Sequence, residues 1–297
     1  MSLNSLIVGP GAIGALACQH AQNLGRVAAY RHRAGINLPK TLTRDHQETQ
    51  LNWSLEAAPP SFIPELIWVC TKAFNAEHAA RTLIARYPKA TIILLHNGLG
   101  PQEAIRKLTP DRCIWGSTTC GAYQHKNQHY TQTLGGKTSL GCPPDTSETA
   151  ESMILLDKIV GSPSALNVHK SDDIEFALWR KMAINAVINP ITALYQTTNG
   201  VLIKPEFNHA IASLCAEIEA IGNALGFKSC NDPVEAVLKV ASLTDSNRSS
   251  MAEDIRLHRK TEIEFINGYL ISKAKLLGLP SAHLNQWYQR IKNIENV

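Results

Sequence analysis

The stretch Leu6-Ile7-Val8-Gly9-Pro10-Gly11-Ala12-Ile13-Gly14 stands near the start of this 297-residue chain and decides how its first half folds. An apolar run leads into a Gly-x-Gly-x-x-Gly turn, and a helical pattern follows over residues 12–24. Gly9 permits a tight turn, Gly11 lets the backbone approach a pyrophosphate, and Gly14 allows close packing of helix on strand. The N-terminus of the helix then offers N–H groups and a positive dipole end to the phosphates. The stretch predicts a dinucleotide-binding loop with contacts at Gly9, Gly11, Ala12, Ile13 and Gly14.

Short apolar runs continue along the first half of the chain and alternate with helical patterns. We predict buried strands at residues 6–8, 27–30, 66–70 and 92–95, and helices near 12–24, 75–86 and 101–107. This alternation is typical of βαβ units and a parallel sheet. Two further segments, 118–125 and 128–134, are predicted as a hairpin appended to that sheet. A helix over about 147–160 and a short strand near 165–169 would complete the domain.

After residue 170 the apolar period changes to 3.6 and strand patterns nearly vanish. We predict one helix over 172–187, with Asn189-Pro190 as the cap and first position of the next. A third would run from Pro205 to Gly226, and Asp232-Pro233 would open a fourth. The capping box Ser250-x-x-Glu253 would open a long last helix reaching about Leu277. The fold class is therefore α/β, with an N-terminal Rossmann-type doubly wound sheet over residues 1–168 and an all-α C-terminal domain over residues 169–297.

The amino-acid composition limits the classes of partner that we expect for this chain. The net charge is +4 and the 29 basic residues are scattered, so nucleic acid is not implied. No apolar run approaches the about 18 residues of a membrane span, and we expect no membrane association and a cytoplasmic location. The seven cysteines form no Cys-x-x-Cys pair, and their number is odd. Reduced thiols are the better interpretation than a disulfide framework or a zinc site, and no metal is expected.

Cations near the strand ends indicate which dinucleotide binds. Arg31 follows the second predicted strand, where an acidic residue would hold the ribose 2′-hydroxyl of NAD and an arginine accommodates a 2′-phosphate. Lys72 follows the next strand and adds a second charge, although both side chains are also typical of solvated loop ends. NADP (NADPH) is favoured over NAD. Asn97, after the fourth strand, would face the ligand crevice, but Asn-Gly is equally a plain turn.

The helical half contains a polar stripe. Lys181, Asn185 and Asn189 are spaced four residues apart and share one helix face, beside the apolar Leu178 and Met182. This pattern predicts a pocket wall with one cation for an acid or a carboxylate; the alternative is an exposed lysine with asparagine caps. Elsewhere in this half, Glu262 lies in a mixed-charge segment typical of a surface, and the Ser250 hydroxyl is expected to cap its helix.

Together these segments resemble the ketopantoate reductase (2-dehydropantoate 2-reductase) family along essentially the whole chain. The first motif is common to many dehydrogenases, and the later ones are far more specific. The resemblance is carried by Gly9-Pro10-Gly11-Ala12-Ile13-Gly14, Thr71-Lys72, His96-Asn97-Gly98, Leu178-Trp179-Arg180-Lys181-Met182-Ala183-Ile184-Asn185-Ala186-Val187-Ile188-Asn189-Pro190, Ser249-Ser250-Met251 and Thr261-Glu262-Ile263-Glu264-Phe265-Ile266-Asn267-Gly268.

The resemblance implies roles position by position. Lys181 matches the general acid of the family, and Glu262 matches its second essential polar residue. Substrate contacts are implied for Asn97, Lys181, Asn185, Asn189, Asn199 and Ser250, and cofactor contacts for Arg31, Lys72, Asn97 and Ala122. The loop before Ser250 differs in length from the family pattern.

The implied activity is NADPH-dependent reduction of ketopantoate to pantoate, in pantothenate and coenzyme A biosynthesis. The partner would be a small 2-keto acid, and the chain would act as a monomer or homodimer. Two alternatives stay open. One is a sibling reductase of another branched 2-keto acid. The other is a non-catalytic NADPH-binding redox sensor, which the intact Lys181 and Glu262 disfavour.

Overall fold

The computed structural model describes residues 2–30, 38–56, 62–125, 128–134, 136–147, 150–161, 164–227 and 232–295. The chain forms two compact units. The first comprises Met1–His96 and Pro101–Ala177, and the second comprises Asn97–Gly100 and Leu178–Val297. The boundary predicted between residues 168 and 169 falls inside a strand of the first unit, β12 (Val168–Lys170). The short Asn97–Gly100 segment groups with the second unit although the chain on both sides of it belongs to the first.

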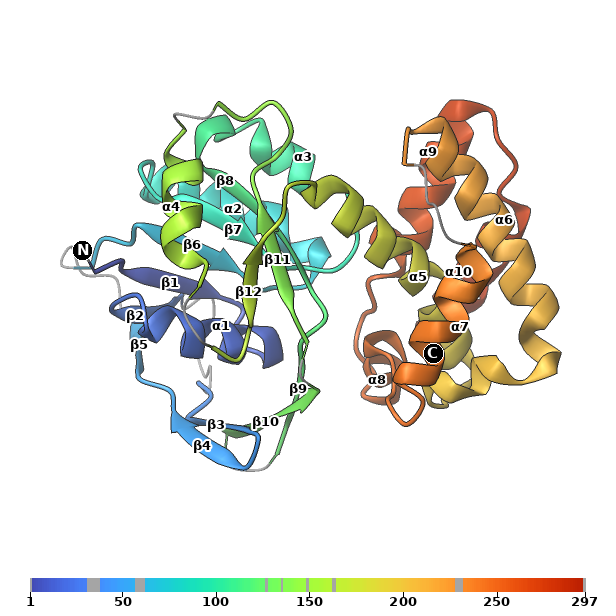
Figure 1. Cartoon of the computed structure of the whole chain (residues 1–297), viewed down its shortest axis with the longest axis horizontal. Helices are drawn as coiled ribbons and strands as arrows, with labels where there is room; N and C mark the ends of the chain where they lie inside the picture. The colour runs from blue at the N-terminus through green and yellow to red at the C-terminus, as the bar shows by residue number, and fades with distance from the viewer. Residues whose placement is uncertain are drawn as a thin grey trace. The chain divides into compact units, whose positions relative to one another are not determined.

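The first unit is built on an eight-stranded sheet (Figure 1). Its neighbouring strands run parallel, except that β11 is antiparallel to β8. The order reverses at β1, which lies between β2 and β6, as in the doubly wound arrangement that binds dinucleotides. The strands in sheet order are β5 (Trp53–Glu56), β2 (Val27–Tyr30), β1 (Ser5–Val8), β6 (Leu66–Val69), β7 (Thr91–Leu94), β8 (Cys113–Thr118), β11 (Thr138–Gly141) and β12.

The central strands are buried along their whole length, as expected where both faces of a parallel sheet are covered. The predicted strands of the first half and the helices between them are confirmed, with ends that shift by at most four residues. The helices of the first unit are α1 (Ala12–Gln22), α2 (Ala73–Arg86), α3 (Pro101–Arg106) and α4 (Glu151–Ile159), with a 3₁₀ turn at Pro110–Arg112.

The predicted hairpin forms, but its expected attachment to the main sheet is wrong. β9 (Gly121–Gln124) and β10 (His129–Leu134) pair antiparallel, and β10 then pairs with β3 (Thr41–Arg44) rather than with a strand of the large sheet. β3 turns into β4 (Gln47–Gln50) through Asp45 and His46, whose positive φ angles of 49° and 65° suit a tight hairpin. Apart from the buried Leu42, β3 and β4 consist of polar residues, so no apolar alternation marks them in the sequence.

Helices and turns without any strand make up the described residues of the second unit, in agreement with the predicted class. Its apolar core includes Trp179, which stacks on Phe227 with ring centroids 4.9 Å apart. None of the described helices is both long and apolar enough to span a bilayer. The elements are α5 (Ile174–Tyr195), which begins in the first unit, 3₁₀ turns at Asn199–Ile203 and Pro205–Phe207, α6 (Asn208–Ala224), α7 (Pro233–Leu243), α8 (Ser250–Arg256), a π-helical turn at Glu264–Gly268, α9 (Tyr269–Leu277) and α10 (Ala282–Glu295).

The prediction that Asn189-Pro190 starts a new helix is wrong, because α5 continues through Pro190 to Tyr195. A proline has no N–H for the carbonyl four residues earlier, which here belongs to Ala186. Asn267 replaces the missing donor: its buried Nδ2 donates to the Ala186 carbonyl at 3.0 Å. A side chain from a distant segment therefore lets the helix pass a residue that would ordinarily end it.

The long last helix predicted from Ser250 to Leu277 is also wrong. α8 ends at Arg256, a turn through His258 (φ 50°) follows, and the chain re-enters helix only after Glu262. The N-cap of α8 is Ser249, whose Oγ accepts a hydrogen bond from the Ala252 N–H at 3.1 Å, so Ser250 is not the capping residue. Two adjacent serines made the register of this cap ambiguous in the sequence. In contrast, Asp232 caps α7 as predicted.

Candidate active site

The glycine-rich loop joins β1 to α1 at the point where the strand order reverses. Gly9 has a φ of +87°, and a Cβ there would lie 2.8 Å from the backbone nitrogen of Thr71, at the end of the neighbouring β6. A Cβ on Gly14 would lie 2.3 Å from the Gly9 carbonyl oxygen. Gly11 is exposed, and a Cβ there would meet nothing within 4 Å. Two glycines therefore serve close packing, and the third borders open space that a ligand can enter.

The beginning of α1 fits an anionic group. Gly11 is its N-cap, no side chain caps it, and its first turn contains no acidic residue. The first N–H groups of a helix have no partner within it and attract phosphates. Ala12 and Ile13, both half-buried, supply such groups beside the open space at Gly11. Backbone donors and free volume thus coincide where a dinucleotide pyrophosphate is expected.

The other predicted cofactor residues of the first unit fall in separate places. Lys72 is half-buried and occupies the N-cap position of α2, directly after Thr71, whose backbone borders Gly9. Ala122 lies on β9, packs against the same core as Ala12 and Ile13, and belongs to a strand that contacts α1. Arg31 lies outside the residues that the structure describes.

The second unit brings three predicted site residues into one hydrogen-bonded chain. Lys181 Nζ donates to Asn97 Oδ1 at 2.7 Å. The amide of the same asparagine donates through Nδ2 to Glu262 Oε2 at 3.1 Å. Lys181 is on α5, Asn97 follows β7, and Glu262 precedes the π-helical turn. We call these three residues the polar cluster. An amide suits the middle position, because its oxygen accepts from an ammonium while its NH₂ group donates to a carboxylate.

The backbone around Asn97 explains why this segment joins the second unit. The N–H of Leu99 donates to the Phe265 carbonyl at 2.9 Å. Gly98 has a φ of +76°, and a Cβ there would lie 2.4 Å from the same carbonyl oxygen. The Asn97–Gly100 strap therefore lies directly on the π-helical turn, and its close approach requires glycine. Asn97 and Glu262 are held together by backbone contacts as well as by their side chains.

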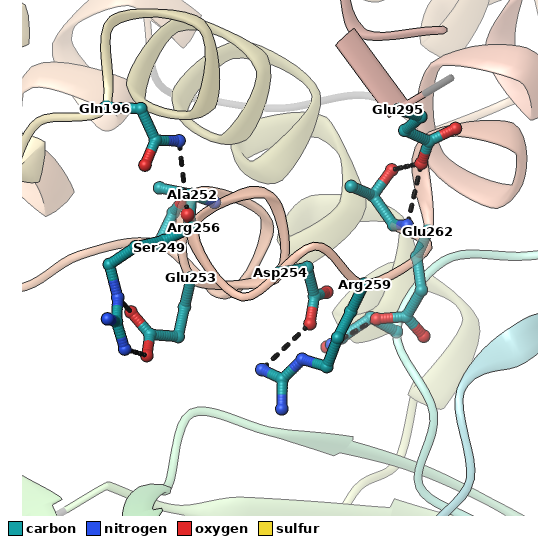
Figure 2. A network of polar contacts seen from close by, with 11 residues as sticks. Gln196, Ser249, Ala252, Glu253, Asp254, Arg256, Arg259, Glu262 and Glu295 are labelled. Atoms are coloured by element: carbon teal, nitrogen blue, oxygen red, sulfur yellow. Dashed lines mark hydrogen bonds and ion pairs between the residues drawn. The ribbon is translucent and has the colours of Figure 1, made fainter. Parts of the chain in front are cut away.

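Glu262 is 3% exposed, so its carboxylate lies in the interior of the unit. A buried carboxylate is tolerated only when it is paired or hydrogen-bonded, and the Asn97 amide meets that need. The carbonyl of Glu262 accepts from the Phe265 N–H at 3.0 Å, a bond that spans three residues where the chain enters the π-helical turn. Such turns are frequent at functional sites because they re-aim side chains within a helix. Figure 2 shows Glu262 beside a further network of polar residues.

The predicted substrate contacts divide into two groups. Asn185 is half-buried and Asn189 buried, and both lie on α5 in the stripe that begins with Lys181. Asn199 is instead tied to the end of α7, because its Nδ2 donates to Thr244 Oγ1 at 2.9 Å. The buried Oδ1 of Asn199 has no hydrogen-bond partner among the described residues. Ser250 is exposed at the start of α8.

Two supporting residues escaped the sequence interpretation. Ser249 caps α8, and its Oγ also lies 2.7 Å from Thr192 Oγ1 on α5. Asn267 supplies the donor that Pro190 lacks. The sequence contains a signal for the second of these, since a proline inside an apolar helical pattern calls for a donor from elsewhere.

The described parts of the chain contain free thiols and no cluster of side chains that could hold a metal ion. The six cysteines found there are all free, and burial raises the pKa of Cys113 and of Cys215 to about 12, so both stay protonated at neutral pH. Among the residues that the structure describes, no three or more His, Cys, Asp or Glu side chains come together to hold a metal ion.

Comparison with known proteins places both units in the same family. A family model described as ketopantoate reductase PanE/ApbA matches residues 5–145, and its companion, described as ketopantoate reductase PanE/ApbA C terminal, matches residues 173–295. A 2-dehydropantoate 2-reductase of Vibrio cholerae serotype O1 is 32% identical over 297 residues, which cover 99% of this chain and 98% of the relative.

Solved structures agree in fold. The probable 2-dehydropantoate 2-reductase of Bacillus subtilis is 26% identical, with a TM-score of 0.79 over 98% of this chain and 100% of that one. A D-mandelate dehydrogenase, solved with NADH and anilino(oxo)acetate, has a TM-score of 0.84 at 23% identity over 99% of each chain. At that identity the second likeness concerns the fold alone.

Proposed function

The chain belongs to the ketopantoate reductase family, and from that premise we propose that it reduces 2-dehydropantoate (ketopantoate) to pantoate with NADPH. The observation that carries the proposal is the polar cluster, in which a lysine ammonium and a buried carboxylate meet through one asparagine amide. A reductase of a 2-keto acid needs a proton donor for the ketone oxygen and hydrogen-bonding groups that orient the acid. The cluster and its neighbours on α5 supply both.

Lys181 is proposed as the general acid. When bound, the reduced nicotinamide supplies a hydride to C2 of the keto acid, and negative charge develops on the C2 oxygen. A cation beside that oxygen stabilises the charge and then donates the proton that completes the alcohol. In the structure the side-chain oxygen Oδ1 of Asn97 accepts a hydrogen bond from the Lys181 ammonium. This bond limits the rotamers that the long lysine side chain can adopt. Asn97 would thereby orient the donor for transfer.

Glu262 is proposed to hold the C4 hydroxyl of ketopantoate or to steady the lysine. Glu262 is buried, so its carboxylate is already desolvated before substrate binds. We therefore expect it to interact with the bound substrate as well as with the transition state. Asn185, Asn189, Asn199 and Ser250 are proposed as the remaining substrate contacts. The partnerless Oδ1 of Asn199 supports this assignment, since a buried acceptor is suited to a substrate hydroxyl.

The cofactor is proposed to be NADPH rather than NADH. The open space at Gly11 and the uncapped start of α1 support a dinucleotide, and Arg31 with Lys72 would meet its 2′-phosphate. Asn97 would also reach the nicotinamide ribose, and Ala122 would line the cofactor. Replacing Arg31 by alanine is expected to weaken NADPH binding roughly tenfold or more, as a charge-assisted hydrogen bond is lost, and to leave NADH nearly unchanged. Fluorescence titration with both cofactors measures this, and equal losses would contradict it.

The proposal is tested by following NADPH oxidation with ketopantoate beside a panel of other 2-keto acids. The panel includes other branched acids and the aromatic acid that corresponds to mandelate, because a sibling specificity is the main alternative. We expect the highest kcat/KM for ketopantoate, which would place the chain in pantothenate and coenzyme A biosynthesis. Preference for another acid would favour the sibling reductase. Tight NADPH binding without turnover of any acid would favour a redox sensor.

A further inference from the structure

The residue before Glu262 is held by the last helix of the chain. The backbone N–H of Thr261 donates to Glu295 Oε1 at 2.7 Å, and the Thr261 hydroxyl donates to the same oxygen. Glu295 is the last residue of α10, 34 positions further along the chain. Figure 2 shows this contact on the backbone immediately next to Glu262. Glu295 has no direct part in the polar cluster, yet it binds the residue that presents the buried carboxylate.

The carboxylate of Glu295 is well placed for such a task. Its side chain is 5% exposed, and its second oxygen accepts from Lys292 Nζ at 3.0 Å, so both oxygens are occupied. The Thr261 hydroxyl oxygen in turn accepts from the Ile263 N–H at 3.2 Å. Bonds to an ionised acceptor are shorter and stronger than neutral ones. Residues on both sides of Glu262 are therefore linked to one buried, charged anchor.

A second anchor lies at the other end of the same loop. The N–H of Arg259 donates to the Asp254 carbonyl at 2.8 Å, and its guanidinium lies 3.1 Å from the buried Asp254 carboxylate. Between these contacts and α8 the chain passes through His258 at a φ of 50°. Regular helix does not continue across residues 257–262. The segment that leads to Glu262 is held by the contacts of Thr261 and Arg259, and the carbonyl of Glu262 accepts from the Phe265 N–H.

We propose that Glu295 is a positioning residue for Glu262, acting through Thr261, in the reaction proposed above. Glu262 lies at the end of a short non-helical segment and accepts a hydrogen bond from the Asn97 amide. A shift of that segment would break this bond and separate Glu262 from the asparagine that binds Lys181. Displacements of about 1 Å at reacting groups cost on the order of 100-fold in rate. The inference rests on the proposed function, because Glu262 matters only if the polar cluster takes part in turnover.

The test compares Glu295→Ala and Thr261→Val with two controls in the full-length chain. Thr261→Val removes the hydroxyl with little change of shape, and Thr261→Ser restores it. Glu235→Ala removes an exposed carboxylate from α7. With the 2-keto acid that the parent chain reduces best, we expect kcat to fall roughly 10- to 100-fold in the first two variants. Cofactor affinity should stay unchanged, Thr261→Ser should recover most of kcat, and Glu235→Ala should match the parent.

A second measurement separates positioning from general loss of structure. Glu295→Ala is repeated in a Glu262→Ala background, where a residue that acts through Glu262 has nothing left to position and should cause no further loss of kcat. An equal loss with and without Glu262 would overturn the inference, as would unchanged kcat in Thr261→Val. If Glu295→Ala fails to fold, the Thr261→Val and Thr261→Ser pair decides alone. A parent chain that turns over no 2-keto acid overturns the proposed function and the inference together, whereas an active parent with unaffected variants overturns only the inference.

Discussion

The two candidate binding regions of the molecule are built in opposite ways. The glycine-rich loop of the first unit is one contiguous segment whose backbone would bind the ligand. Glycines stand where a Cβ would collide with neighbouring backbone, Gly11 borders open space, and the start of α1 offers its N–H groups. The polar cluster of the second unit consists of side chains from three distant segments. Asn97 lies 84 residues from Lys181 and 165 from Glu262.

This difference predicts different consequences of substitution. In the loop, the same change of one glycine to alanine acts on folding or on cofactor binding according to what surrounds the Cβ. In the polar cluster, a change should act on turnover while the unit keeps its fold, because the surrounding apolar core is untouched. Four experiments separate these behaviours.

The largest effect is expected at the polar cluster. Lys181→Ala should lower kcat about 10²- to 10⁴-fold, or roughly 3–5 kcal/mol in the transition state, because the proton donor is lost. NADPH affinity should change little, since the lost interaction grows only as charge forms on the substrate oxygen. Steady-state kinetics and a separate cofactor titration measure the two quantities.

The control for this experiment is Lys239→Ala, which removes an exposed lysine from α7. It should match the parent chain in both measurements. A Lys181→Ala variant with near-normal kcat would remove the general-acid assignment and leave a polar cluster with a purely structural role.

The next largest effect is expected in the loop, where two glycines form a matched pair. Gly14→Ala should destabilise the first unit by about 3 kcal/mol, because its Cβ would lie 2.3 Å from the Gly9 carbonyl oxygen and packed backbone must move. Gly11→Ala should lower the free energy of unfolding by at most about 1 kcal/mol, the effect of a poorer N-cap, and should weaken NADPH binding, because its Cβ enters only the space proposed for the pyrophosphate. Urea unfolding and cofactor titration of both variants test this, and equal stability losses would contradict the interpretation.

The fold was largely predictable because its main elements are local patterns. The strands at 27–30 and 66–69 and the glycine turn follow from runs of neighbouring residues. β8 was not predicted, although it is fully buried, because Gly116, Ser117 and Thr118 interrupt its apolar run. β3 and β4 were missed because they contain a single apolar residue, Leu42, and are held by pairing of β4 with β3 and of β3 with β10.

The site was less predictable, because its residues are brought together by contacts between distant segments and not by a local pattern. The four-residue spacing suggested the stripe from Lys181 to Asn189, but only the family resemblance singled out Glu262, since nothing local marks a glutamate as buried. The bridging role of Asn97 depends on a strap that crosses to the other unit, which no spacing rule contains. Pro190 misled the helix prediction because the donor that rescues it is 77 positions away in the sequence, at Asn267.

That rescue gives the third prediction. Asn267→Ala should lower the free energy of unfolding by about 2 kcal/mol, because it leaves the buried Ala186 carbonyl without its donor. Adding Pro190→Ala restores a backbone N–H four residues after Ala186 and should recover a large part of the loss. Asn285→Ala, at an exposed position of α10, should have no effect. Chemical unfolding of the four chains measures the series, and a double variant no more stable than Asn267→Ala would show that the carbonyl is not the reason.

The smallest effect separates two adjacent serines whose roles the sequence could not divide. Ser249 is buried, caps α8 and contacts Thr192, so Ser249→Ala should cost about 1 kcal/mol of stability. Ser250 is exposed and makes no cap, so Ser250→Ala should leave stability unchanged and, as a proposed substrate contact, raise KM for the 2-keto acid. Thermal unfolding and steady-state kinetics of both variants measure the split. If Ser249→Ala also raised KM and Ser250→Ala left KM unchanged, the substrate assignment would be one residue out of register, because the hydroxyl that caps α8 would also be the one that meets the substrate.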